Sequence, residues 1–147
     1  KEELQKGMDW YDKIILDTNV IISALIKSGI TREIILKDSF EFLTPAYMLT
    51  EIYRYKKLIC KKSKISFKEF DELVNKLFRY IRVLNPASYF SYLKKASKLI
   101  DDVDDISFIA TALALNCSIW SDDEHFQKQK EIKVFTTKQI KELINEI

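Results

Sequence analysis

The sequence predicts an α/β fold, a three-layer α/β/α sandwich around a mostly parallel central sheet. The chain has 147 residues and is 47% apolar, which suits one domain with a single core. It holds only two glycines and two prolines, so a disordered or linker-rich chain is excluded. Short apolar runs alternate with segments of helical periodicity, as in a parallel sheet covered by helices. We expect a flexible arm over residues 1–7 and a single domain over residues 8–147.

The first half of this domain is predicted to hold two strand-to-helix units. The apolar run at 13–16 is followed by Asp17-Thr18-Asn19, three residue types that favour helix N-caps, and then by an apolar helix. A second strand is expected at 40–43. It is followed by Thr44-Pro45, an N-cap and a proline at the first helical position, and by a helix that runs toward Lys57 or beyond.

The second half continues the alternation of strands and helices. Ser66 and Glu69 form a capping-box pattern ahead of apolar residues at helical spacing up to Ile81. The remaining elements are expected as a strand at 81–84, a helix at 87–100, a helix starting at the Asp cluster 101–105, strands at 118–121 and 133–135, and a last helix capped by Thr136 or Thr137.

Nine of the 22 acidic residues fall in four places along the chain. The 13 other acids are outnumbered by 24 Lys and Arg residues, so the rest of the chain has a formal charge of +11. Strand ends gather at the carboxyl edge of a parallel sheet, so we expect the four acidic places to converge there. An acidic site on a basic body suits an enzyme with a divalent cation and a polyanionic substrate. The nine acids are Asp17, Glu51, Asp101, Asp102, Asp104, Asp105, Asp122, Asp123 and Glu124.

Converging carboxylates need a counter-charge, because each close pair repels by about 1 kcal/mol or more at an effective dielectric near 20. Mg²⁺ or Mn²⁺ suits such a site, since both take oxygen ligands and leave positions for a phosphate and a water. Cys60 and Cys117 lie far apart and His125 is the single histidine, so a Cys/His zinc site is excluded. The predicted chemistry is metal-assisted hydrolysis of a phosphodiester.

Each acidic place also has a purely structural interpretation. Asp17 could serve only as a helix N-cap, and Glu51 could be one exposed helix residue among several. The 101–105 run could be a solvated turn stabilised by a helix dipole, and 122–124 a plain acidic turn. His125 could be a surface residue or a contact near the substrate. Convergence of the four acidic places in space would favour the catalytic interpretation.

A basic segment begins directly after Glu51. It has six basic residues and no acid over eleven positions, interleaved with Tyr53 and Tyr55. Such a segment can bind phosphates beside an active site while the tyrosines stack on unpaired bases. The alternative is a favourable arrangement of charge at a helix end. The six basic residues are Arg54, Lys56, Lys57, Lys61, Lys62 and Lys64.

Four segments carry these acids in a fixed order: Ile15-Leu16-Asp17-Thr18-Asn19-Val20, Leu49-Thr50-Glu51-Ile52, the stretch from Asp104 to Leu113, and the stretch from Ile119 to Phe126. In this order they resemble the motifs of PIN-domain ribonucleases, over nearly the whole chain from about Met8. The resemblance implies an α/β/α sandwich and a Mg²⁺- or Mn²⁺-dependent endoribonuclease. Many such proteins are toxins of VapBC-type toxin–antitoxin pairs.

The resemblance also implies roles for individual residues. It places Asp17, Glu51, Asp105 and Asp123 in a metal-binding and catalytic quartet. Asn19 and Ser121 take the positions of residues that support the first and last acids, and the auxiliary acids are Asp102, Asp104 and Asp122. The stretch Trp120-Ser121-Asp122-Asp123 departs from the commoner Val-Thr-Arg-Asp, so a phosphate contact at position 122 is not expected.

The expected mechanism is in-line attack of water on the scissile phosphate. Asp17, Asp105 and Asp123 would hold the principal metal, while Glu51 orients or deprotonates the water. The products would carry a 5′-phosphate and a 3′-hydroxyl.

The partners follow from the same resemblance. They are single-stranded RNA, an antitoxin protein and a second copy of the chain, with 67–81 or 89–93 as candidate dimer surfaces. No apolar run reaches the roughly 20 residues of a membrane span, so a cytoplasmic protein is expected. The alternatives are a catalytically inactive module that binds RNA or protein, and a Mg²⁺-dependent phosphatase of the haloacid-dehalogenase kind. The phosphatase would need a second aspartate where Asn19 stands.

Overall fold

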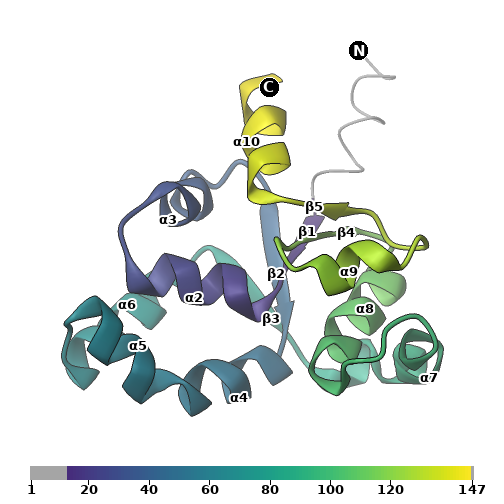
Figure 1. Ribbon diagram of the computed structural model, residues 1–147, viewed down its shortest axis with the longest axis horizontal. Coiled ribbons are helices and arrows are strands. Elements are labelled where there is room, and N and C mark those ends of the chain that lie inside the picture. Colours follow the sequence, from purple (N-terminus) through teal and green to yellow (C-terminus); the bar gives the residue numbers. More distant parts are fainter. Residues whose placement is uncertain (1–12, 147) are drawn as a thin grey trace.

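A five-stranded parallel sheet forms the centre of the protein (Figure 1). The computed structural model describes residues 13–146, so the expected arm over 1–7 lies outside the described residues. The strand order is β3-β2-β1-β4-β5, and every pairing between described strands is parallel. The predicted α/β fold with a mostly parallel sheet is confirmed. The strands are β1 (Lys13–Leu16), β2 (Glu41–Pro45), β3 (Ile81–Leu84), β4 (Ser118–Trp120) and β5 (Val134–Phe135).

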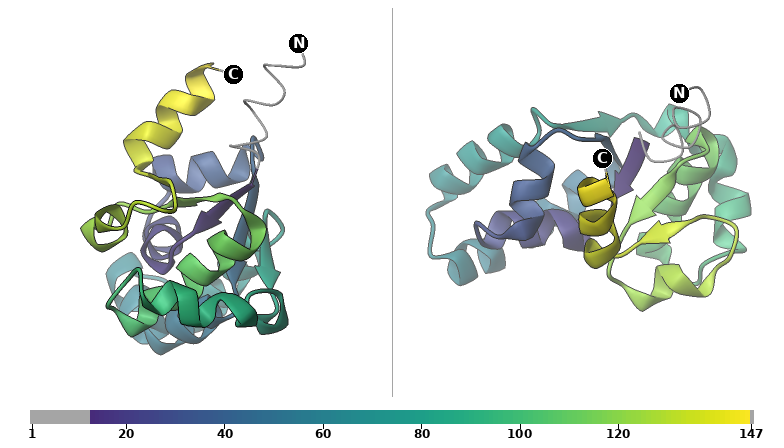
Figure 2. Two further views of the ribbon diagram at one scale, coloured as in Figure 1. Left: turned by 90° about the vertical axis from the view of Figure 1, so that its right-hand side faces the viewer. Right: turned by 90° about the horizontal axis from the view of Figure 1, so that it is seen from above.

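Helices lie on both sides of this sheet, with α2, α3, α5 and α6 on one side and α7 and α8 on the other (Figures 1 and 2). None of the described helices is both long and apolar enough to cross a membrane. The helices are α2 (Thr18–Ile26), α3 (Ile30–Leu36), α4 (Tyr47–Arg54), α5 (Lys56–Ser63), α6 (Phe67–Leu77), α7 (Leu93–Ser97), α8 (Val103–Leu115), α9 (Glu124–Lys128) and α10 (Thr137–Glu146), with short 3₁₀ turns η1 (Pro86–Ser88) and η2 (Phe90–Tyr92).

The core is centred on β1, whose residues Ile14, Ile15 and Leu16 are fully buried. A strand covered on both faces is apolar along its whole length instead of alternating, which explains the continuous run in the sequence. Trp120 at the end of β4 is also fully buried, and its indole nitrogen donates to Thr137 Oγ1 at 2.9 Å. This bond ties β4 to the start of α10.

The prediction of a single helix starting at Thr44-Pro45 after the second strand is wrong in two respects. Pro45 is the last residue of β2, paired with Leu84, and the helix begins only at Tyr47. Thr44 caps no helix, because its hydroxyl donates to Leu16 O at 3.1 Å and joins β2 to β1. The helix also breaks at Tyr55, whose backbone lies outside the helical region, so α4 and α5 are separate elements.

Two other expectations differ in their bounds. The helix expected over 87–100 is divided into the 3₁₀ turns η1 and η2 and the short helix α7. Asn85 Oδ1 accepts from Ala87 N at 3.0 Å and starts the first tight turn at Pro86. The capping box at Ser66 and Glu69 is present as predicted, but α6 ends at Leu77 and Ile81 belongs to β3. Helices α3 and α9 carried no expectation from the sequence.

The strand order places a topological switch point between β1 and β4. From β1 the chain adds β2 and β3 on one side, and it later adds β4 and β5 on the other. In open α/β sheets ligands bind at such a point, outside the carboxyl ends of the strands. Asp17 directly follows β1, and Ser121 directly follows β4.

Candidate active site

Asp17 is held rigidly at the switch point. It is 3% exposed and caps α2, because its Oδ1 accepts from Val20 N at 2.8 Å. Its other oxygen, Oδ2, accepts a short hydrogen bond from the hydroxyl of Ser121. Ser121 Oγ in turn accepts from Asp123 N at 3.0 Å. The end of β1 and the loop after β4 therefore form one hydrogen-bonded unit.

Glu51 reaches the same place from α4. It is 7% exposed, and its Oε1 accepts from Thr18 Oγ1 at 2.5 Å. One helical turn earlier, the hydroxyl of Tyr47 donates a short hydrogen bond to Asp104 Oδ1. Helix α4 is thus joined through side chains to both α2 and α8.

The N-terminal turn of α8 supplies three more acids. Asp102 is the N-cap, and its Oδ1 accepts from Asp104 N at 2.9 Å. Asp105 directly follows Asp104, and its side chain is half-buried. Its Oδ2 is buried and has no hydrogen-bond partner within residues 13–146. A buried carboxylate oxygen without a partner is costly, so this atom is suited to bind a cation or to hold a proton.

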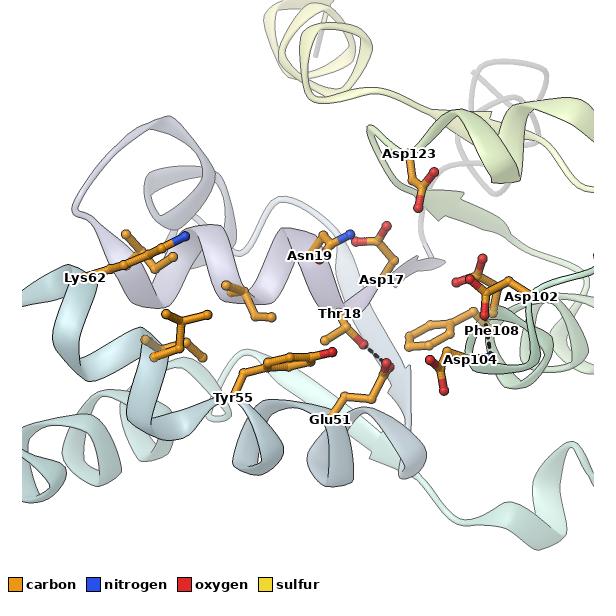
Figure 3. Close-up of a pocket in the computed structure, with 15 residues that line it drawn as sticks. Asp17, Thr18, Asn19, Glu51, Tyr55, Lys62, Asp102, Asp104, Phe108 and Asp123 are labelled. Atoms are coloured by element: carbon orange, nitrogen blue, oxygen red, sulfur yellow. Dashed lines mark hydrogen bonds between the residues drawn. The ribbon is translucent and has the colours of Figure 1, made fainter.

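These acids line one cavity of about 350 Å³ (Figure 3). In Figure 3, Asp17, Asp102 and Asp123 surround one end of it, and Lys62 lies at the opposite end. Between them Tyr55 points its hydroxyl toward Thr18 and Glu51. The residues that line the cavity are Asp17, Thr18, Asn19, Ile22, Ile26, Glu51, Tyr55, Leu58, Ile59, Lys62, Asp102, Asp104, Asp105, Phe108 and Asp123.

Burial and mutual repulsion raise the pKa values of the acids in this cavity. The pKa of Asp17 rises to about 6, chiefly through burial, against the opposing effect of its hydrogen bonds from Ser121 and Val20. The pKa of Asp105 rises to about 7 through burial and through the charges of Asp102, Asp123 and Asp17. Burial also raises the pKa of Glu51. The charged forms of these acids are therefore disfavoured without a counter-ion.

The donor set fits a hard divalent cation. The side chains around the acidic end of the cavity offer carboxylate oxygens, the ligand type that Mg²⁺ and Mn²⁺ prefer. A cation there would relieve the repulsion among Asp17, Asp105 and Asp123 and give Asp105 Oδ2 a partner.

Not every predicted site residue lies in this cavity. Asp122 is directed to the start of α10, where its Oδ1 and Oδ2 accept from Thr137 N at 2.7 Å and Thr137 Oγ1 at 2.6 Å. Asn19, which the resemblance places as a supporting residue for Asp17, lines the cavity.

Of the six basic residues predicted to bind RNA, only Lys62 lines the cavity. Lys56 is engaged elsewhere, with its Nζ 2.9 Å from Asp71 Oδ1 and 5.0 Å from the centre of the Phe67 ring. Arg54, Lys57, Lys61 and Lys64 are not among the lining residues. Helical spacing explains this selection, because Leu58, Ile59 and Lys62 share one face of α5.

Sequence reasoning overlooked two residues that orient the acids. Thr18 was considered only as a capping type, yet its hydroxyl binds Glu51. Tyr47 precedes Glu51 by four residues, a spacing that places both side chains on one face of a helix, and this signal was available in the sequence.

Comparisons with known proteins agree with this architecture. The family model for the PIN domain matches residues 15–144. A chain of VapBC2 from Rickettsia felis, solved bound to a DNA fragment from its promoter, is similar with a TM-score of 0.67 and 14% identity, over 84% of this chain and 98% of that one. A chain of VapBC-1 from nontypeable Haemophilus influenzae is similar with a TM-score of 0.65 and 16% identity, over 86% of this chain and 98% of that one.

A chain of FitAB bound to the IR36 DNA fragment gives a TM-score of 0.55 and 25% identity, over 84% of this chain and 94% of that one. A comparison with curated proteins gives no match. The matched region of the family model begins in β1 and ends in α10, so it includes every acid that lines the cavity. The resemblance seen in the sequence motifs is thereby confirmed, and the chain belongs to the PIN domain family.

Proposed function

We propose that this PIN-domain protein is a metal-dependent endoribonuclease that hydrolyses RNA phosphodiester bonds. One observation carries the proposal: Asp17, Glu51, Asp105 and Asp123, from four separate segments, line a single cavity at the switch point of the sheet. A purely structural role would not require acids from four segments to be buried or half-buried against one another. The solved neighbours from VapBC and FitAB systems support a nuclease of a toxin–antitoxin pair.

The residues that would hold the ion are Asp17, Asp105 and Asp123, with Asp102 and Asp104 beside them. When bound, Mg²⁺ or Mn²⁺ would neutralise these carboxylates and stabilise the charge that develops on the scissile phosphate. Ser121 orients Asp17 by its hydroxyl, and the backbone of Asp123 orients Ser121. Asp122 takes no part, because both of its oxygens bind the start of α10.

Glu51 is the proposed general base. Thr18 fixes one oxygen of its carboxylate, and Glu51 lines the same cavity as the metal-binding acids. Burial raises its pKa, which makes the carboxylate a better proton acceptor for the attacking water than an exposed glutamate. Loss of the proton leaves a hydroxide that attacks the phosphorus in line. The P–O3′ bond breaks as the new P–O bond forms, and the departing 3′-oxygen takes a proton from solvent, so the products carry a 5′-phosphate and a 3′-hydroxyl.

The RNA strand is proposed to lie along the part of the cavity between α2 and α5. Ile22 and Ile26 line it from α2, while Tyr55 and Lys62 line it from the other side. Tyr55 is 41% exposed and can stack on an unpaired base, and Lys62 can pair with a phosphate. Stacking of this kind requires a base that is not paired, so single-stranded RNA is the proposed substrate.

Three partner and compartment assignments complete the proposal. An antitoxin protein is proposed because the solved neighbours come from two-component VapBC and FitAB complexes. A homodimer and a cytoplasmic location also stay proposals from the sequence. In the described chain, Phe67 and Phe90 are the most exposed aromatic residues of the two candidate dimer segments, at 55% and 70%.

The proposal is tested by cleavage of a mixed-sequence single-stranded RNA with Mg²⁺ or Mn²⁺. Asp17→Asn is the test variant, and Asp38→Asn, the same chemical change at an exposed site outside the cavity, is the matched control. We expect cleavage by the wild type and by the control, and none by Asp17→Asn or in EDTA. Cleavage that persists in EDTA or in Asp17→Asn would contradict the proposal. Metal binding without cleavage would favour the inactive RNA- or protein-binding module.

A further inference from the structure

His125 lies beside the acidic end of the cavity, although its sequence position marks it only as a local contact. It is in the first turn of α9, two residues after Asp123, and its side chain is 55% exposed. Its Nδ1 lies 3.6 Å from Asp123 Oδ1. A ring nitrogen of His125 and one carboxylate oxygen each of Asp102 and Asp105 lie within 4.8 Å of one another. This group draws on two helices, α8 and α9, whose first turns meet here.

The spacing of these three ligand atoms suits a metal ion. Two ligands that bind one ion at about 2.1 Å can be at most about 4.2 Å apart, so only small side-chain rotations are needed to bring the three together. His125 is exposed enough to make such a rotation. The Asp102 carboxylate is already oriented by its hydrogen bond from Asp104 N.

A second observation points to a ligand at the same place. Asp105 belongs to this group, and its Oδ2 is the buried side-chain oxygen without a hydrogen-bond partner in the described part of the chain. Asp102 also lines both the acidic cavity and a neighbouring one that includes His125 and Lys128. The three ligands therefore lie where the two cavities meet, and an ion can enter from solvent.

We infer that Asp102, Asp105 and His125 bind a divalent transition-metal ion through two oxygens and one imidazole nitrogen. The inference rests on the proposed function, because Asp105 is shared with the carboxylate quartet. It deepens that proposal by separating the two candidate ions. Mg²⁺ strongly prefers oxygen ligands, whereas Mn²⁺ and the later first-row ions accept imidazole. The site therefore selects Mn²⁺ over Mg²⁺, and His125 is the residue that makes the distinction.

The nearby Asp123 strengthens this assignment. Metal-bound histidines commonly direct their second ring nitrogen toward a carboxylate, which fixes the ring and makes it a better ligand. Asp123 Oδ1 lies 3.6 Å from His125 Nδ1, so a small rotation of the exposed ring brings this nitrogen within hydrogen-bonding distance, and the Asp123 carboxylate is itself held by His125 N at 2.9 Å from Oδ1.

The experiment measures metal binding directly, on untagged protein and without an activity assay. The chain contains a single histidine, so any imidazole nitrogen bound to Mn²⁺ must come from His125. Pulsed electron paramagnetic resonance of the Mn²⁺ complex detects such a nitrogen by its coupling to the ion. Calorimetry gives the Kd values for Mn²⁺ and Mg²⁺. The test variant is His125→Gln, and Lys128→Gln, on the same helix and lining the same cavity, is the matched control.

We expect nitrogen coupling in the wild type and in Lys128→Gln but not in His125→Gln. We also expect His125→Gln to weaken Mn²⁺ binding at least about tenfold, with the Kd for Mg²⁺ changed less than about twofold. Bound Mn²⁺ without nitrogen coupling would overturn the inference, and so would an equal loss of both ions in His125→Gln.

Two further outcomes separate this inference from the proposed function. If Asp17→Asn abolishes Mn²⁺ and Mg²⁺ binding while His125→Gln changes neither, the inference fails and the nuclease proposal stands. If the wild type binds neither ion, both fail.

Discussion

The acidic cavity has two sides that hold their carboxylates in different ways. On the strand side, formed by Asp17, Ser121 and Asp123, hydrogen bonds run from Asp123 N through Ser121 to Asp17. On the helix side, formed by Asp102 and Asp105 at the start of α8, Asp105 Oδ2 is buried and has no hydrogen-bond partner among the residues that the structure describes. The strand side is therefore organised before an ion binds, whereas the helix side carries an unfavourable charge that an ion would relieve. The first side fixes geometry, and the second makes binding favourable.

The largest expected effect comes from breaking the strand side. Asp17→Asn removes the negative charge of the most buried acid while keeping its shape, so RNA cleavage should fall at least about 10²-fold. The measurement is the initial rate of cleavage at saturating Mn²⁺. A rate within a few-fold of the wild type would show that Asp17 is only the N-cap of α2.

Ser121→Ala tests the same side without changing an acid. The hydroxyl orients Asp17 and lowers its pKa, so its loss should reduce cleavage about 10-fold to 100-fold, in the range found for residues that orient metal ligands. The pH at which cleavage reaches half its maximum should also move upward, since the pKa of Asp17 rises further. A lower rate with an unshifted pH profile would mean that Ser121 acts only on folding.

Asp105→Asn tests the helix side and should have the opposite effect on stability. In EDTA at pH 8 the variant should melt higher than the wild type, by about 2 to 5 °C, because it removes a half-buried charge. It should also lose most of the increase in Tm that Mn²⁺ gives the wild type. A lower Tm in EDTA would show that the Asp105 charge is already compensated within the protein.

The pH dependence of stability follows from the same two acids. The folded state raises the pKa of Asp17 from 3.8 to about 6 and that of Asp105 from 3.8 to about 7. Between about pH 4 and 7 the folded state therefore binds more protons than the unfolded state, and the free energy of unfolding falls as the pH rises. Urea unfolding in EDTA at pH 5 and pH 8 measures this fall. Stability that rises over this range would contradict the raised values.

The smallest expected effect belongs to Asp122, the acid beside Asp123 that lies outside the cavity. Asp122→Asn weakens the capping of α10 and should cost about 1 kcal/mol of stability or less. Cleavage should change less than about twofold, measured in parallel with Asp17→Asn. A large loss of activity would show that Asp122 takes part in metal binding, as the sequence motifs predicted.

The sequence predicted the sheet well because its signals are local. The apolar run at 13–16 is a strand as predicted, and the position of Asp17 at the end of this run places it at the carboxyl edge. The helix boundaries after β2 could not be predicted, because Thr44 and Pro45 are ordinary helix-start residues. Their role in β2 depends on partners far along the chain, Leu16 and Leu84.

The same distinction between local signals and distant contacts explains which site residues could be predicted from the sequence. Asp17, Asp105 and Asp123 could be nominated from motif position, but the turn of Asp122 away from the site could not be predicted. Adjacent residues at a strand end point in different directions, and the direction that leads to Thr137 is visible only in three dimensions. In the basic segment, all six residues looked equivalent until helix α5 placed Lys62 toward the cavity and Lys56 toward Asp71.

The most direct test of a preorganised strand side and an ion-dependent helix side is calorimetric titration of Mn²⁺ at pH 6.5 in two buffers of different ionisation enthalpy. Acids with pKa values of about 6 and about 7 are partly protonated at this pH, so ion binding must release protons. We predict binding with proton release in the wild type, less proton release in Asp105→Asn, and weaker binding in Asp17→Asn. Binding without proton release, or no binding by the wild type, would contradict the account.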